Sequence, residues 1–238
     1  MTSVTIKTYP TPKILHLQLT VATVTSIAKG TWDMIAYFLS QYPALGDAGV
    51  SGYSFVFDNL TNPFGPPDTP PVSGITTSFA LQDTNDPNDG LKLFAPIFAH
   101  INATWPTFTI LPNVTAYASF WDWYQPNKDS MAAGSNMYVC SRLLDAKALS
   151  GDRNATRDAF QAFTGAGTAT AYLVSGKGVW NAQPRGGSNA VLPAWRKAYV
   201  HASEFSETKS RPWRTGTKMI SMRSRLCAVQ RSRRGQGF

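Results

Sequence analysis

The residue types that most often carry out catalysis or bind metals are scattered through this sequence. The three histidines, His16, His100 and His201, lie far apart, each beside apolar residues, and the two cysteines, Cys140 and Cys227, form no CxxC pair. Transition metals need His, Cys or carboxylate ligands at short, defined spacings, so the sequence predicts no metal site and no catalytic histidine. Two cysteines cannot form a disulfide framework, and we interpret them as unpaired thiols.

Acid–base catalysis needs a group whose pKa lies near the working pH. The sequence has only two glutamates, Glu204 and Glu207, both near its C-terminal end, and most of its aspartates stand beside Pro, Asn or Gly in predicted loops. Neither set indicates a general acid or base, and the sequence nominates no catalytic residue.

An aromatic run at Phe120, Trp121, Trp123 and Tyr124 is a candidate for binding an aromatic substrate by stacking. Four aromatic side chains within five positions cannot all face one core, so we expect at least one at the surface or in a cavity. Packing of most of them in the core is the alternative.

Four Asn-x-Thr sequences are acceptor sites for N-glycosylation: Asn59, Asn102, Asn113 and Asn154. The composition predicts about 2 such sequences by chance, so the excess is mild. We predict that these four residues are glycosylated in a chain that enters the secretory pathway.

The formal net charge of +8 comes from the C-terminal end. Residues 209–238 carry nine Lys and Arg and no Asp or Glu, which leaves 13 basic against 14 acidic residues in 1–208. The body is close to neutral, so we expect no nucleic-acid partner, although a basic tail can contact phosphate or an anionic membrane through charge alone. No run approaches the roughly 18 apolar residues of a membrane-spanning helix, so no membrane partner is predicted.

Hydrophobic periodicity divides the chain into strands and helices. Alternation over 14–21 predicts a half-buried strand and argues against the apolar segment of a signal peptide. Further strands are predicted at 2–8, 53–57, 75–81, 107–117, 136–143, 168–174 and 198–202, and helices at 31–42, 88–102, 119–124 and 155–163. Thr31 is expected to cap the helix at 31–42 and Pro43 to end it. The order of these elements predicts an α+β fold, with a mostly antiparallel sheet and helices packed on one face. The helices at 31–42 and 88–102 are both expected on that face.

Three segments carry a family resemblance: VTIKTYP (Val4–Pro10), GSNMYVCSRLL (Gly134–Leu144) and GGSNAVLPAWRKAYVHA (Gly186–Ala202). The last is the most specific, because Asn189, Pro193, Trp195 and Arg196 fall in one short run. Together they resemble fungal members of the berberine-bridge-enzyme-like FAD-linked oxidoreductases, the oxygen-dependent, PCMH-type family.

The resemblance implies a domain division. Residues 1–12 resemble the last strand of an FAD-binding domain, residues 13–202 the substrate-binding domain, and residues 203–238 nothing in the family. We interpret 203–238 as a basic, disordered tail. The family's large FAD-binding domain and its C-terminal Tyr-x-Asn segment have no counterpart here, so the resemblance indicates a truncated chain that binds FAD weakly and self-associates through an uncovered domain face.

The resemblance also implies a function. The intact family oxidises an alcohol or amine carbon of a small-molecule substrate with oxygen as acceptor, and fungal members belong to secondary-metabolite pathways, including ergot-type alkaloid pathways. Family members pass through the secretory pathway; with no signal peptide in the sequence, the location of this chain stays open. Tyr117, Tyr138 and Tyr172 lie on predicted strands and are candidates to face a flavin edge. The alternative is an inactive vestigial or regulatory fragment.

Overall fold

The computed structural model describes residues 3, 5, 6, 8, 10–61, 66, 68–128, 137–164, 168–183, 187 and 191–207. The strands are β1 (Ile14–Val24), β2 (Val50–Leu60), β3 (Val72–Gln82), β4 (Thr109–Tyr117), β5 (Met137–Asp145), β6 (Thr168–Leu173) and β7 (Ala198–Glu207). The helices are α1 (Thr31–Ser40), α2 (Tyr42–Asp47), α3 (Pro87–Thr104), α4 (Phe120–Asn127), α5 (Ala146–Ser150), α6 (Arg153–Thr164) and α7 (Lys177–Trp180), with 3-10 turns at Thr25–Ile27 and Pro193–Arg196. None of the helices within these ranges is long and apolar enough to cross a bilayer.

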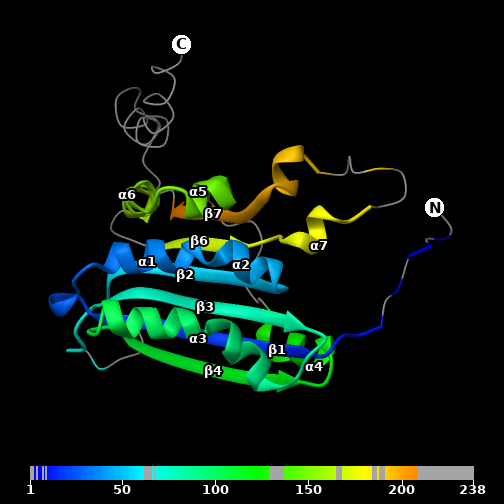
Figure 1. The fold of residues 1–238 in the computed structure, drawn as a ribbon, viewed down its shortest axis with the longest axis horizontal. Helices are drawn as coiled ribbons and strands as arrows, with labels where there is room; N and C mark the ends of the chain where they lie inside the picture. Colours follow the sequence, from blue (N-terminus) through cyan, green and yellow to red (C-terminus); the bar gives the residue numbers. More distant parts are fainter. Residues whose placement is uncertain are drawn as a thin grey trace, which may run out of the picture.

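The strands form one seven-stranded sheet in the order β4-β1-β3-β2-β6-β7-β5, and every neighbouring pair is antiparallel. Figure 1 shows α1, α2 and α3 in front of this sheet. The predicted α+β fold with an antiparallel sheet is confirmed.

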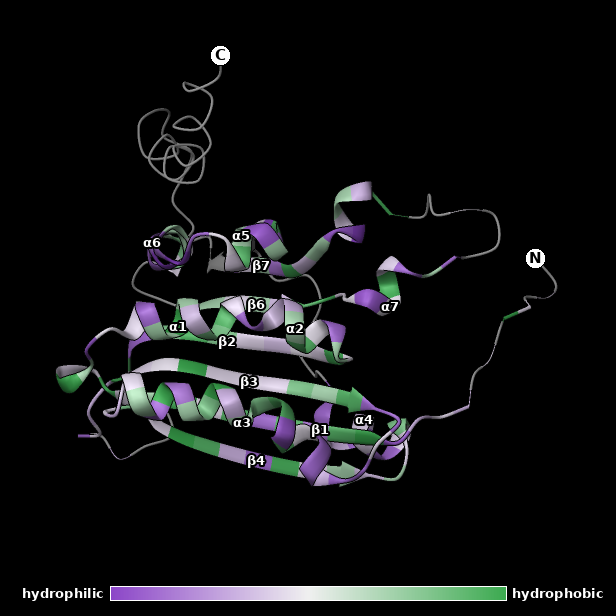
Figure 2. Ribbon diagram, in the orientation of Figure 1, coloured by the Kyte–Doolittle hydropathy of each residue, from purple (hydrophilic) through white to green (hydrophobic). Residues whose placement is uncertain are grey.

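The core lies between the helices and one face of the sheet. Leu15, Leu17 and Leu19 of β1 alternate toward it and are fully buried. An aromatic stack joins the layers: Phe79 of β3 packs edge-on against Tyr42 of α2, with ring centroids 5.7 Å apart, and stacks on Phe94 of α3 at 6.0 Å. The predicted placement of the two long helical segments on one face is therefore confirmed. In Figure 2 hydrophobic and hydrophilic residues are interspersed along α1 and α3, as expected for helices with one buried side.

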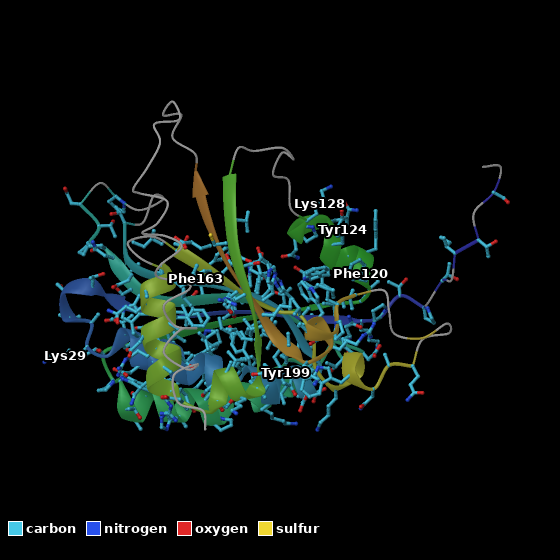
Figure 3. The ribbon with its side chains drawn as sticks, turned by 90° about the horizontal axis from the view of Figure 1, so that it is seen from above. Lys29, Phe120, Tyr124, Lys128, Phe163 and Tyr199 are labelled. Atoms are coloured by element: carbon cyan, nitrogen blue, oxygen red, sulfur yellow. The ribbon has the colours of Figure 1, made fainter. Side chains whose placement is uncertain are left out.

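Helix α4 is the exception to the one-sided packing. Its Trp123 packs edge-on against His16 of β1, which points to the opposite face from Leu15 and Leu17. Figure 3 shows α4, with Phe120 and Tyr124, across the sheet from α1 and α6.

The predicted helix start at Thr31 is confirmed, but the predicted capping role of Thr31 and the predicted end at Pro43 were wrong. Gly30 is the N-cap residue of α1, with φ of 72°, and Thr31 lies inside the helix. Glycine suits this left-handed position, and a Cβ at Gly30 would lie 2.8 Å from Trp105 Nε1. Pro43 stands in the first turn of α2, where a missing N–H costs nothing, so it begins a second helix instead of ending the first.

The ends of the chain differ in part from expectation. β7 continues to Glu207 and pairs with β5 there, so the sheet extends past the predicted boundary at residue 202. The described residues among 2–8 belong to no strand, which differs from the strand predicted there, and Ile6 is exposed. Assignment of 1–12 to a neighbouring domain stays a prediction, and the basic segment 209–238 lies outside the described residues.

Replacement of Phe79 by alanine should lower the free energy of unfolding by about 3–5 kcal/mol, because it removes a buried ring that contacts two helices. Phe55→Ala is the matched control: Phe55, on the neighbouring strand, is 40% exposed on the other face and should cost less than about 1 kcal/mol. Urea unfolding followed by circular dichroism measures both variants. Equal losses would contradict the location of the core.

Candidate functional site: the open face of the sheet

The face of the sheet turned away from α1, α2 and α3 is called the open face here. The strand register places one residue from each strand in line across it, and we call this line the cross-sheet row. Its members, in sheet order, are Asn113, Gln18, Ser78, Tyr53, Tyr172, His201 and Leu143. Residues two positions along a strand share its face, so Thr76 and Phe55 flank this row.

One half of the cross-sheet row is an aromatic platform. The rings of Tyr53 and Tyr172 lie 6.0 Å apart, and Tyr172 stacks on His201 at 6.0 Å. Trp195, from the 3-10 turn before β7, covers His201 with ring centroids 5.1 Å apart. Phe55 packs edge-on against Tyr53 at 5.4 Å. Clustered aromatic rings of this kind can bind an aromatic ligand by stacked or edge-to-face contacts.

The other half of the row borders a cavity of about 270 Å³ between the sheet and α4. It is lined by Gln18, Tyr53, Phe55, Thr76, Thr77, Ser78, Trp123 and Asn127. Helix α4 is fixed above it: Ser119 caps the helix by accepting from the backbone N–H of Asp122, and Asn127 donates to the Trp123 carbonyl at 2.7 Å. Aromatic walls with a few converging hydrogen-bonding groups are typical of small-molecule sites.

His16 lies directly behind this cavity. It is 2% exposed, and its Nε2 is 2.8 Å from Ser78 Oγ, which lines the cavity. Trp123 covers the imidazole edge-on at 6.0 Å, and Tyr117 lies 6.5 Å away. Burial lowers the pKa of His16, because the charged form loses its hydration, and it lowers the pKa of His201 for the same reason.

The residues named from the sequence divide between this site and the rest of the molecule. Tyr117 and Tyr172 lie on the open face, and the side chain of Tyr138 lies outside the described part of the chain. In the aromatic run, Trp123 lines the cavity while the other three rings are exposed, which confirms that at least one would lie at a surface or cavity. His100 stacks on Tyr37 on the helix side.

The four predicted glycosylation residues all lie at exposed positions: Asn59, Asn102, Asn113 and Asn154. Only Asn113 is in the cross-sheet row, where its Nδ2 donates to Gln18 Oε1 at 3.2 Å. Cys140 is a free, half-buried cysteine, and Cys227 lies outside the described residues. Glycosylation itself stays a prediction.

Sequence reasoning missed His16 and Ser78. Their signal was present in the alternation over 14–21, which already placed His16 and Gln18 opposite the leucines. The pairing of His16 with Ser78 depends on the register of β1 with β3, and a sequence pattern within one strand does not contain it.

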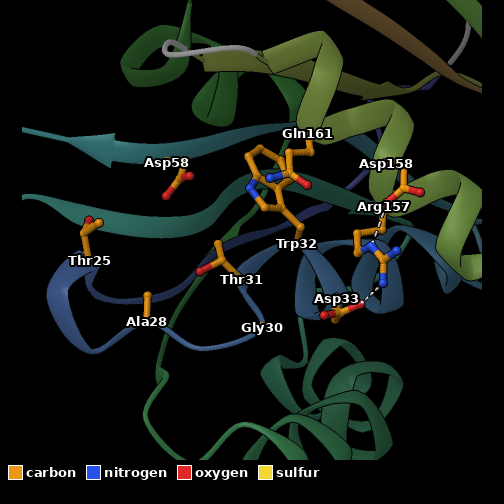
Figure 4. A pocket seen from close by; sticks show the side chains of 10 residues that line it. All are labelled: Thr25, Ala28, Gly30, Thr31, Trp32, Asp33, Asp58, Arg157, Asp158 and Gln161. Carbon is orange, nitrogen blue, oxygen red and sulfur yellow. Dashed lines mark hydrogen bonds and ion pairs between the residues drawn. The ribbon is translucent and has the colours of Figure 1, made fainter.

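A second, larger cavity of about 600 Å³ lies on the helix side, beside α1 and α6 (Figure 4). Its lining residues are Thr25, Ala28, Gly30, Thr31, Trp32, Asp33, Asp58, Arg157, Asp158 and Gln161. Arg157 donates to Asp33 Oδ1 at 3.0 Å and to Asp158 Oδ1 at 2.8 Å. Because two carboxylates already pair with this guanidinium, Arg157 is not available to bind an anionic ligand. Its ion pair with Asp33 instead links α6 to α1. The described residues also contain no cluster of His, Cys, Asp and Glu that could hold a metal.

No family profile matches the chain. An uncharacterized FAD-linked oxidoreductase of Arthroderma benhamiae is 28% identical over 211 residues, which cover 84% of this chain and 34% of that protein. The crystal structure of the VAO-type flavoprotein MtVAO713 from Myceliophthora thermophila C1 matches 93% of this chain with a TM-score of 0.73 and 25% identity, over 39% of its own length. The chain is similar to VAO-type, FAD-linked oxidoreductases. This resemblance implies FAD as the cofactor.

A second VAO-type flavoprotein from Myceliophthora thermophila C1, MtVAO615, supports the fold alone. Its TM-score is 0.60 at 15% identity, and the match covers 91% of this chain and 37% of that one. The chain thus spans a little over a third of the length of the VAO-type proteins it resembles.

The buried histidines predict that the domain loses stability in mild acid. A folded-state pKa below the ordinary value of 6.5 means that the unfolded chain binds more protons, so the free energy of unfolding should fall as the pH drops below about 6.5. His16→Gln should reduce this slope, and His100→Gln, at an exposed position, is its control. Urea titrations at several pH values between neutrality and pH 5 measure the slope.

Burial raises the pKa of Glu204, so this group increases the free energy of unfolding as the pH falls toward its ordinary pKa of 4.5. This effect opposes that of the histidines, and it is completed at a lower pH. A slope in the His16→Gln variant equal to that of the unaltered chain would show that His16 is not buried as an uncharged group.

Proposed function

We propose that this chain forms the substrate-binding wall of a VAO-type flavoenzyme, with its open face turned toward the flavin. The observation that carries the proposal is the cross-sheet row: an aromatic platform beside a cavity, on a sheet face that no long helix of the described residues covers, in the fold of VAO-type flavoproteins. In the reaction that we propose, an alcohol or amine carbon of a small molecule is oxidised, with oxygen as the final electron acceptor.

The residues present fit one part of FAD. The isoalloxazine ring needs an apolar wall with hydrogen-bonding groups, and the aromatic rings of Tyr53, Tyr172 and Phe55 beside polar Gln18 supply both. Trp123 Nε1 is buried and has no acceptor among the described residues, so an incoming oxygen or nitrogen would satisfy it. The pyrophosphate needs cations or backbone donors, and the cross-sheet row contains no Lys or Arg. We infer that other parts of a longer protein hold the phosphates.

FAD, when bound, supplies a two-electron acceptor. This chain's residues bind and orient the molecule to be oxidised. Phe55, Tyr53 and Trp123 enclose an apolar ring, while Ser78, Thr76 and Gln18 offer hydrogen bonds at the floor of the cavity. A cavity of about 270 Å³ holds a molecule of one or two rings. We therefore propose a small aromatic alcohol or amine as the substrate class.

The biological setting belongs to the same proposal. Arthroderma and Myceliophthora are fungi, which supports a fungal enzyme. A role in secondary metabolism, ergot-type alkaloid pathways included, is proposed from the family resemblance, although an ergot-type ring system is larger than the one or two rings that the cavity holds. Passage through the secretory pathway is proposed from the four exposed Asn-x-Thr sites.

Riboflavin, used as an isoalloxazine probe, should bind to the open face of the purified chain. Titration into ¹⁵N-labelled protein should shift amide signals of β1, β2, β3 and β6, and Phe55→Asp should remove the shifts by placing a charge in the stacking surface. Val179→Asp on α7, with similar exposure of the original residue, is the matched control and should leave them in place. Shifts confined to the helix side, or none at all, would contradict the proposal.

The alternative proposal is an inactive or regulatory fragment. A chimera separates the two functions: residues 10–207 replace the corresponding part of MtVAO713, and flavin reduction by benzyl alcohol is followed by absorbance. An active substrate wall predicts reduction. A chimera that retains flavin and is not reduced by a panel of aromatic alcohols and amines supports the inactive fragment.

A glycan on Asn113 should weaken riboflavin binding, because it would occupy the cross-sheet row beside Gln18. In protein from a glycosylating host, Asn113→Gln should restore the riboflavin-induced shifts, whereas Asn102→Gln on α3 should not. Mass spectrometry of the peptides gives the occupancy at each residue. If only Asn102→Gln restored the shifts, riboflavin would bind on the helix side, and the proposed flavin wall on the open face would be contradicted.

A further inference from the structure

One hydroxyl group in the cavity differs from its neighbours. Ser78 Oγ lines the cavity and lies 2.8 Å from the Nε2 atom of buried His16. Thr76, two residues earlier on the same face of β3, also lines the cavity, but its hydroxyl pairs with the hydroxyl of Thr20 at 2.9 Å. Of these two hydroxyls, only that of Ser78 is joined to a group that can take up a proton.

We propose that Ser78 and His16 form a proton-accepting pair for a hydroxyl group of the ligand in this cavity. The inference rests on the proposed function, and it adds the residues that remove the proton. Ser78 contacts the ligand, and His16 acts through Ser78 as a positioning residue.

The surroundings of His16 keep the imidazole uncharged and able to accept. Trp123 of α4 and Tyr117 of β4 cover the ring, and Ser78 of β3 is its hydrogen-bond partner. Among the hydrogen bonds, ion pairs and ring contacts of His16 within the described residues, none involves a charged side chain. Burial without a carboxylate favours the neutral ring. The proposal requires the tautomer with its proton on Nδ1: Nε2 then accepts from the Ser78 hydroxyl, and the lone pairs of Ser78 Oγ are free for a donor in the cavity.

The proton balance of alcohol oxidation follows from this arrangement. The FAD of an intact enzyme would accept the hydrogen of the alcohol C–H bond as a hydride, together with its two electrons. The O–H bond breaks as its proton passes to Ser78 Oγ, while the proton of Ser78 passes to His16 Nε2, and the carbon–oxygen bond becomes a carbonyl. The imidazolium then returns its proton through Ser78 to water that enters when the product leaves, because a buried charge is costly.

The test uses the full chain with ¹⁵N-labelled histidine, and benzyl alcohol as the probe. Benzyl alcohol should shift the ring-nitrogen signals of His16, which His16→Gln identifies by their disappearance. Benzyl methyl ether, of similar shape but with no donor, should leave these signals unchanged. Ser78→Ala should abolish the effect of the alcohol on His16 and weaken its binding by about three- to ten-fold, the loss of one hydrogen bond.

Two variants separate the proton-accepting role from a merely structural one. Ser78→Thr keeps the hydroxyl and should restore the coupling, since threonine is well tolerated in strands. Thr76→Val removes a neighbouring hydroxyl on the same face of β3 and should weaken binding while the His16 shift persists. The proposal is overturned if the ether shifts His16 as the alcohol does, or if Ser78→Ala retains the shift.

Riboflavin binding to the same variants distinguishes failure of this inference from failure of the proposed function. If riboflavin binds to the open face and benzyl alcohol leaves His16 unchanged, the flavin wall stands and the pair is wrong. If neither probe binds to the open face, both proposals fail together.

Discussion

The packing of helices on a single face of the sheet is the constraint on which the rest of this structure depends. The stack of Tyr42, Phe79 and Phe94 holds α2 and α3 against the same side of β3. Because side chains alternate along a strand, burial of one set of residues fixes which residues face the other way. The position of the cross-sheet row is thus set by the core, because the hydrophobic residues that face the helices leave the residues between them on the open face.

Much of the fold was predictable from local patterns, whereas the site was only partly so. Alternation located β1, and the apolar stripes located α1 and α3 with the correct shared face. Short elements such as α5 were missed because five residues carry too little periodicity to distinguish them from a turn. Pro43 was misinterpreted because proline both ends and begins helices, and only tertiary packing decides between these roles.

The contact between His16 and Ser78 spans 62 positions in the chain, so it depends on strand register and not on spacing. The alternation in the sequence placed His16 on the face opposite the core leucines, and the structure buries it there beneath Trp123. His16 is a candidate functional residue because β3 places Ser78 against it and because Ser78 lines the cavity. A buried polar residue with one defined partner next to a cavity is more informative than an isolated histidine in a sequence.

The strict alternation of core and row residues has an evolutionary consequence. A substitution at Tyr53 or Ser78 changes what the open face recognises, while Ser54 and Phe79, adjacent in sequence, continue to hold the helices. Selection can therefore act on recognition and on folding at neighbouring codons with little interference. A scaffold of this kind can diversify its chemistry while its backbone persists, which agrees with a TM-score of 0.73 at only 25% identity to MtVAO713.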